Sequence, residues 1–157
     1  MGMYTCLAFK AALNEAGKTV AAALKIESIE ENPWDNAAQH LPTTPAKFLS
    51  QWRRTFIPFG AADQFYDWAR EQDFDPQAKY TEGDGQWEVV CALKNYENEI
   101  QDFLREVLPQ MIAEPCLVQV LYEEWNSPTI IRVHPTGEQD HIQSGAYTEP
   151  DCHPWRW

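Results

Sequence analysis

The chain has 157 residues, of which 24 are acidic and 12 are basic, giving a formal net charge of −12. A surface of this sign repels nucleic acid and anionic membranes, so the composition excludes proteins that bind either through a basic face. Seven tryptophans and a hydrophobic content of 44% indicate a globular chain with a buried core, and they exclude a disordered one.

The N-terminal region predicts a β-hairpin. Residues 4–13 form the first strand, 14–17 the loop and 18–29 the second strand. The alanines of both segments also suit a helix by intrinsic propensity. Alternation of apolar and other side chains favours strands, and in the second segment the alternating apolar residues are Val20, Ala22, Leu24 and Ile26.

Two helices are predicted next, after a loop over residues 30–43. Thr44 and Pro45 open the first in the favoured order of cap and proline, and Pro58 and Gly60 end it. Its apolar face consists of Phe48, Leu49, Trp52 and Phe56. The second helix covers residues 61–72. Its acidic residues at a spacing of four predict a solvated stripe that is available to a partner: Asp63, Asp67 and Glu71.

The most regular stretch is a β-α-β-β unit. After a short strand over 78–82 and a glycine turn, residues 86–94 alternate as a strand. Asn95 then predicts a helix cap, and an apolar stripe follows with Phe103 in its middle and a kink or a break at Pro109. Strands are predicted from Cys116 to Glu123 and from Thr129 to Val133. The helix should bury Phe103 against the sheet.

The element order β-β-α-α-β-β-α-β-β predicts the α+β class, with a mainly antiparallel sheet and helices packed on one face. Residues 1–133 are expected to form a single domain. Residues 134–157 are rich in proline, glycine and polar residues, and predict a tail or an extended arm packed on that domain.

Three of the four cysteines, Cys6, Cys91 and Cys116, fall inside predicted strands, which is typical of buried free thiols in a reducing compartment. The sequence shows no secretory signal and no apolar run of membrane-spanning length. These features predict a cytoplasmic protein.

The C-terminal segment contains a weak candidate metal set: His134, His141, Cys152 and His153. Its spacing does not match the closely paired ligands of structural zinc sites. A polar tail that contains histidines is therefore the favoured interpretation, and neither a metal nor a cofactor is predicted.

No catalytic motif is present, so an enzyme is the less favoured prediction. Glu123 and Glu124 are neighbours at a strand end and point to opposite faces, which suits partner binding, together with Trp125, better than acid–base catalysis. Arg53 and Arg54 are predicted to form internal ion pairs. The acidic set Glu97, Glu99 and Asp102 is predicted to lie mostly on the surface.

This small, acidic, aromatic-rich and motif-free profile resembles that of bacterial immunity or inhibitor proteins. The resemblance is one of profile and covers no definable stretch. It implies a binding module that recognises a basic protein, such as a toxin or nuclease, which it would neutralise. The alternatives are an enzyme or small-ligand binder with a pocket between sheet and helices, and a structural subunit of a larger assembly.

Overall fold

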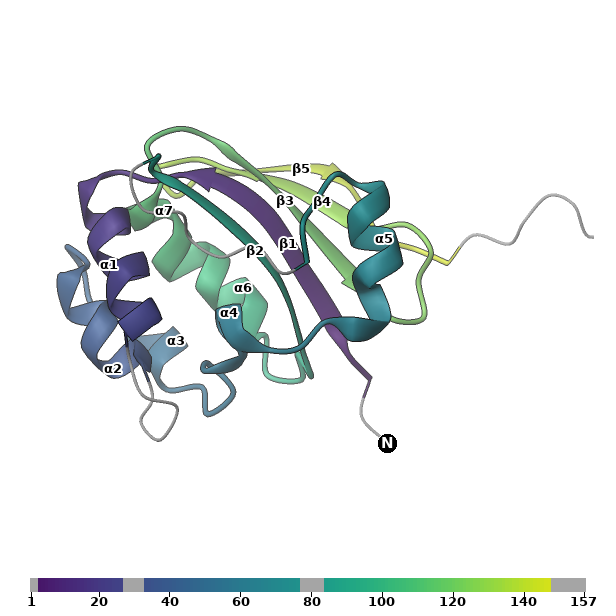
Figure 1. Ribbon diagram of the computed structural model, residues 1–157, viewed down its shortest axis with the longest axis horizontal. Helices are drawn as coiled ribbons and strands as arrows, with labels where there is room; N and C mark the ends of the chain where they lie inside the picture. The colour runs from purple at the N-terminus through teal and green to yellow at the C-terminus, as the bar shows by residue number, and fades with distance from the viewer. Residues whose placement is uncertain (1–2, 27–32, 77–83, 148–157) are drawn as a thin grey trace, which may run out of the picture.

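The computed structural model describes residues 3–26, 33–76 and 84–147, which build a five-stranded sheet with helices on its faces (Figure 1). The strand order is β2-β1-β3-β4-β5, and every neighbouring pair is antiparallel. The strands are β1 (Thr5–Ala12), β2 (Gln86–Leu93), β3 (Cys116–Tyr122), β4 (Thr129–Val133) and β5 (Gln139–Gln143).

The α-helices are α1 (Glu15–Ile26), α2 (Pro33–Ala37), α3 (Ala46–Leu49), α4 (Phe56–Phe59), α5 (Tyr66–Glu71), α6 (Glu99–Asp102) and α7 (Leu108–Met111). Two 3₁₀ turns, η1 (Ala38–His40) and η2 (Asp63–Phe65), and a π-helical turn, η3 (Phe103–Val107), complete the list. Most of the helical layer lies on one side of the sheet, and α5 lies on the other (Figure 1). The predicted α+β class is confirmed.

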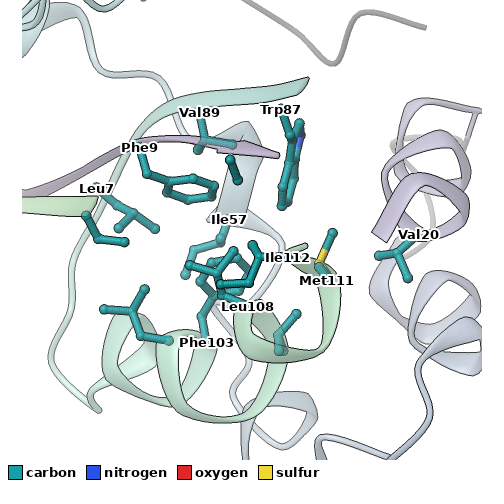
Figure 2. Packing of buried hydrophobic residues seen from close by; sticks show 14 of the residues in the cluster. Leu7, Phe9, Val20, Ile57, Trp87, Val89, Phe103, Leu108, Met111 and Ile112 are labelled. Atoms are coloured by element: carbon teal, nitrogen blue, oxygen red, sulfur yellow. The ribbon is translucent and has the colours of Figure 1, made fainter. Parts of the chain in front are cut away.

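The main core is centred on Phe103, which is fully buried as predicted (Figure 2). Four other aromatic rings lie within 6.4 Å of its ring centroid: Phe9, Trp34, Phe48 and Trp87. These rings come from two strands and two helices. Phe103 therefore joins the sheet to α2 and α3 as well as to its own helix.

A second, smaller core lies on the opposite face of the sheet. Because side chains alternate along a strand, Cys6 and Ala8 of β1 point away from the Phe103 side. Phe65 and Ala69 cover them from η2 and α5. The apolar face of this helix was predicted, but the prediction that the helices pack on one face of the sheet is wrong, because α5 covers the opposite face.

The strand predicted over residues 18–29 is wrong in its described part, because residues 15–26 form helix α1, while residues 27–29 lie outside the described residues. Asn14 caps this helix by accepting the backbone N–H of Gly17 on its side-chain oxygen at 2.8 Å. A Cβ atom on Gly17 would lie 2.1 Å from the Met111 carbonyl oxygen, so only glycine allows α1 to approach α7 this closely. Tertiary packing of Val20 and Leu24, one helical turn apart, decides for the helix.

Two further predictions are corrected in the segment before α5. Residues 33–40, predicted as loop, form α2 and η1 because Trp34 is fully buried in the main core. The helix predicted from Thr44 to Phe56 ends at Leu49. Gln51 then donates its side-chain amide to the Asp102 carboxylate at 2.8 Å, so contacts with α6 replace a continued helix.

The helix after β2 is irregular. The helix start predicted at Asn95 is wrong, because α6 begins at Glu99 with Asn98 as its N-cap. The side-chain oxygen of Asn95 still accepts the N–H of Ile100, in the first turn of α6, at 2.8 Å. The turn before Pro109 is π-helical, and α7 restarts at Leu108 with the proline near its N-terminus. Where a kink or break was predicted at Pro109, the helix changes from π to α geometry just before the proline, which cannot donate the hydrogen bond of a regular helix.

The described part of the C-terminal segment contributes β5, which pairs with β4 across a register shift next to Ile130. The predicted strand over residues 78–82 lies outside the described residues, as do Cys152 and His153.

Candidate functional site: an aromatic groove at the end of β1 and β2

An open cavity of about 540 Å³ lies at the end of the sheet where β1 begins and β2 ends. We call it the aromatic groove, since its walls carry Tyr4, Trp52 and Phe56. Its charged lining residues are Arg53, Asp63 and Lys94.

The register of the sheet builds one wall. Thr5 pairs with Leu93, so the next residues along the two antiparallel strands, Tyr4 and Lys94, stand beside one another. The Lys94 ammonium lies 5.6 Å from the centre of the Tyr4 ring, within the distance of a cation–π contact. Tyr4 is fixed in turn by the Glu123 carboxylate, which accepts its backbone N–H.

Gly60 brings the opposite wall against β2. Its carbonyl oxygen accepts the N–H of Ala92 at 3.2 Å, and a Cβ atom on Gly60 would lie 2.1 Å from the Ala92 carbonyl oxygen. Only glycine permits this approach. The contact holds Phe56 and Asp63, on either side of Gly60 in sequence, at the groove.

Two buried carboxylates hold the segment that carries Trp52. Glu99 is fully buried and pairs with the Arg53 guanidinium at 3.2 Å. Asp102, 1% exposed, accepts a hydrogen bond from Gln51 at 2.8 Å and lies 3.6 Å from the Lys47 ammonium. The predicted surface position of both carboxylates is therefore wrong. They contact the segment 47–53, which packs against α6, and these contacts replace the water that an exposed carboxylate would bind.

The Arg53 side chain links this buried pair to the groove. Its guanidinium carbon lies 4.4 Å from the Trp52 ring centre and 5.3 Å from that of Tyr96. Both rings have one face against a cation and remain open to solvent, with exposed fractions of 67% for Trp52 and 55% for Tyr96. The predicted internal ion pairs are confirmed, since Arg53 pairs with Glu99 and Arg54 with Asp35.

Exposed aromatic side chains are concentrated at this end of the molecule. Most of those in the described chain line the groove or lie beside it: Tyr4, Trp52, Phe56, Phe59 and Tyr96. Large exposed aromatics gathered at one site are typical of binding surfaces, where they bury much area with few rotatable bonds.

The acidic stripe predicted on the second helix is exposed, but only its first residue reaches the groove. Asp63 lines the groove. Partial burial raises the pKa of Tyr66, and the hydrogen bond that its hydroxyl donates to Asp63 raises it further. Asp67 and Glu71 lie further along α5, where Asp67 pairs with Arg70 at 3.6 Å.

The second predicted set lies behind Tyr4. Glu123 contacts the backbone of Tyr4, whereas Glu124 is exposed beside it in sequence. Partial burial raises the pKa of Tyr122, and the charges of Glu124 and Glu123 raise it further. Trp125 packs edge-on against Tyr122 with ring centroids 5.7 Å apart. Glu123 therefore supports the groove, while Trp125 packs within the fold.

The described members of the candidate metal set do not converge. His134 bonds to the Asp140 carboxylate at 2.7 Å, and His141 bonds to the Ser144 hydroxyl at 2.9 Å. Within residues 3–26, 33–76 and 84–147, no three histidine, cysteine or acidic side chains are grouped as metal ligands. Cys6, Cys91 and Cys116 are free and buried, and burial raises the pKa of each thiol.

Sequence reasoning missed the residues that shape the groove. Trp52 and Phe56 were predicted on the buried face of a helix, because apolar residues at helical spacing usually face a core. Tyr4 and Lys94 were predicted only as the ends of strands, and nothing in the sequence indicated that they lie side by side. Gly60 was the one indication in the sequence, because a glycine at this point predicts the end of the helix. It does not predict that Gly60 packs against β2.

In the parts of the chain that the structure describes, no helix has the length and apolar character needed to span a membrane. No protein-family model matches the chain, and no curated protein or solved structure is significantly similar to it.

Proposed function

We propose that this protein is a binding module that recognises another protein through the aromatic groove. The observation that carries the proposal is the gathering of exposed aromatic rings around one open cavity. Tryptophan, tyrosine and arginine are the residues that most often dominate binding energy at interfaces. Here Trp52, Tyr96 and Arg53 form one connected cluster.

The charge of the chain supports a basic partner. The net charge is −12, and acidic side chains flank the groove on two sides, through Asp63 on one side and Glu123 with Glu124 on the other. Such a surface attracts a basic protein over long distances and speeds association. In its sharpest form, the proposal is that the partner is a basic toxin or nuclease and that binding neutralises it.

The test compares baits that differ only at the groove. Wild-type protein, Trp52→Ala and Leu117→Ala would be used to capture partners from cells of the native host, because Leu117 is a half-exposed apolar residue on β3 outside the groove. Each captured protein would then be purified and its binding measured directly. A partner that binds wild type and Leu117→Ala, but binds Trp52→Ala at least tenfold more weakly, supports the proposal. Partners that bind all three equally contradict it.

A small-ligand binder is the second candidate function, because the cavity volume of about 540 Å³ falls within the usual range for ligand pockets. A small molecule that raises the melting temperature of the wild type but not of Trp52→Ala would favour this candidate. The protein-binding function would then need its own evidence.

A further inference from the structure

We propose that the aromatic groove receives an anchor from the partner protein that combines an aromatic side chain with a neighbouring carboxylate, and that Lys94 pairs with this carboxylate. The inference rests on the proposed protein-binding function and names the chemistry of the contact. The negative charge of the whole chain would attract the partner from a distance, whereas the positive charge of Lys94 would act only inside the groove.

Lys94 is the cation that remains available. Among the lysine and arginine side chains that the structure describes, it alone makes neither an ion pair nor a hydrogen bond with a described group; its contact is with the Tyr4 ring. Its ammonium lies in the wall of an open cavity, where an incoming carboxylate can reach it.

Arg53 does not compete for this role. Its guanidinium is paired with the buried Glu99 carboxylate and lies against two aromatic rings, with only 15% of the side chain exposed. The pair is internally neutral. An arriving anion therefore meets the single positive charge of Lys94 on one wall and the negative charge of Asp63 on another. This asymmetry orients the carboxylate towards Lys94.

The remaining walls favour an aromatic group beside that carboxylate. Trp52 and Phe56 present exposed rings, and offset or edge-to-face packing between rings adds to the burial of apolar area. A basic anchor is disfavoured, because an arginine or lysine placed among these rings would lie close to the Lys94 ammonium.

Short capped peptides test the chemistry without the full partner. Acetyl-Asp-Trp-amide, acetyl-Asn-Trp-amide and acetyl-Lys-Trp-amide present the same ring with a negative, neutral and positive neighbour. Their dissociation constants would be measured from amide chemical-shift changes in titrations of the isotope-labelled full-length chain. We expect the Asp peptide to bind about threefold more tightly than the Asn peptide, as for a partly exposed ion pair, and the Lys peptide to bind most weakly.

Variants identify the residues. Lys94→Gln should remove the preference for Asp over Asn, whereas Arg70→Gln, which removes an exposed cation on α5, should keep it. Trp52→Ala should weaken the binding of all three peptides. Dispersed amide spectra would show that each variant is folded.

Three outcomes would overturn the inference: equal affinity for the Asp and Asn peptides, tightest binding of the Lys peptide, or no binding of any peptide at the groove. None of these decides the proposed function, which depends on whether a full-length partner needs Trp52. Acetyl-tryptophan with a free carboxylate would be titrated alongside its amide. Tighter binding of the free acid than of its amide would support the inference, because the free acid presents the same ring beside a carboxylate.

Discussion

The Arg53 guanidinium lies 3.2 Å from the carboxylate of Glu99, a side chain with no exposed surface. This contact joins the helical layer over the core to the exposed aromatic surface, because Arg53 also lies against Trp52 and Tyr96. The stability of the fold and the shape of the groove therefore depend on the same ion pair.

Glu99→Gln should destabilise the protein by about 3 kcal/mol, the lower end of the range for breaking a buried ion pair, because Arg53 keeps some access to water. Urea unfolding followed by fluorescence measures the change. Glu15→Gln is the matched control, since its pair with Lys18 is exposed, and its free energy of unfolding should stay unchanged. Equal effects of the two substitutions would contradict the structural role of Glu99.

Phe103→Ala should lower the free energy of unfolding by about 3–5 kcal/mol, because the side chain is fully buried among four other rings. Leu117→Ala, at a half-exposed position, should change it by less than about 0.5 kcal/mol. Thermal and urea unfolding of both variants would check the difference. A Phe103→Ala protein with the wild-type melting temperature would refute the placement of this helix.

The pKa of Asp140 should lie below its ordinary value of 3.8, because His134 hydrogen-bonds to the carboxylate at 2.7 Å and the charges of His134 and Arg132 add to the effect. A group with a lowered folded-state pKa stabilises the fold fully above its unfolded value, and this contribution disappears as the pH falls through the folded value. The stability difference between wild type and Asp140→Asn should therefore shrink in acid below pH 3.8. A carboxyl NMR titration measures the pKa directly, and His134→Ala should raise it.

Cys6, Cys91 and Cys116 should react slowly with thiol reagents in the folded protein. Burial raises the pKa of Cys6 and of Cys116 to about 12 and that of Cys91 well above its ordinary 9.0, so the reactive thiolate is scarce. Cys152, which the sequence places in the polar C-terminal segment, should react faster. Mass spectrometry of the native protein after timed alkylation distinguishes the sites. A disulfide between any two strand cysteines would contradict the expectation.

Reversing the acidic stripe to Asp63→Lys, Asp67→Lys and Glu71→Lys should slow association with a basic partner and reduce its dependence on salt. The melting temperature should change little, because these side chains are exposed. The control reverses three exposed carboxylates towards the other end of the sheet and keeps the net charge equal: Glu15→Lys, Glu114→Lys and Glu138→Lys. Stopped-flow association rates would separate local from global steering. Equal slowing by both triple variants would place the effect in net charge alone.

The strands were predictable because their signal is local. Alternation along β2 placed Trp87, Val89, Cys91 and Leu93 on one face, and the observed core contains all four. The bounds of β4 match the β-branched run from Thr129 to Val133. A strand face needs only period two and a sheet to join, so a short window of sequence specifies it.

The same local reasoning failed where two structures share one pattern. The alternating apolar residues of 18–26 fit a strand, but Val20 and Leu24 also fall on one face of a helix. In the structure, α1 buries that face against the core. Alanine propensity favoured the helix, and Gly17 lets its first turn lie closely against α7. That contact joins residues far apart in the sequence, so no window around Gly17 contains it.

Apolar periodicity within single elements was enough to predict the buried thiols and the central position of Phe103, and the order of the elements was enough to predict the α+β class. The groove could not be predicted in this way, because it forms from segments that are far apart in the sequence. Helical spacing does not distinguish a face that meets solvent from one that meets another segment, so Glu99 was predicted outside and is buried, while Trp52 was predicted inside and is exposed. The segment 47–53 packs against α6 and covers the carboxylates of Glu99 and Asp102, while its own Trp52 side chain remains exposed to water.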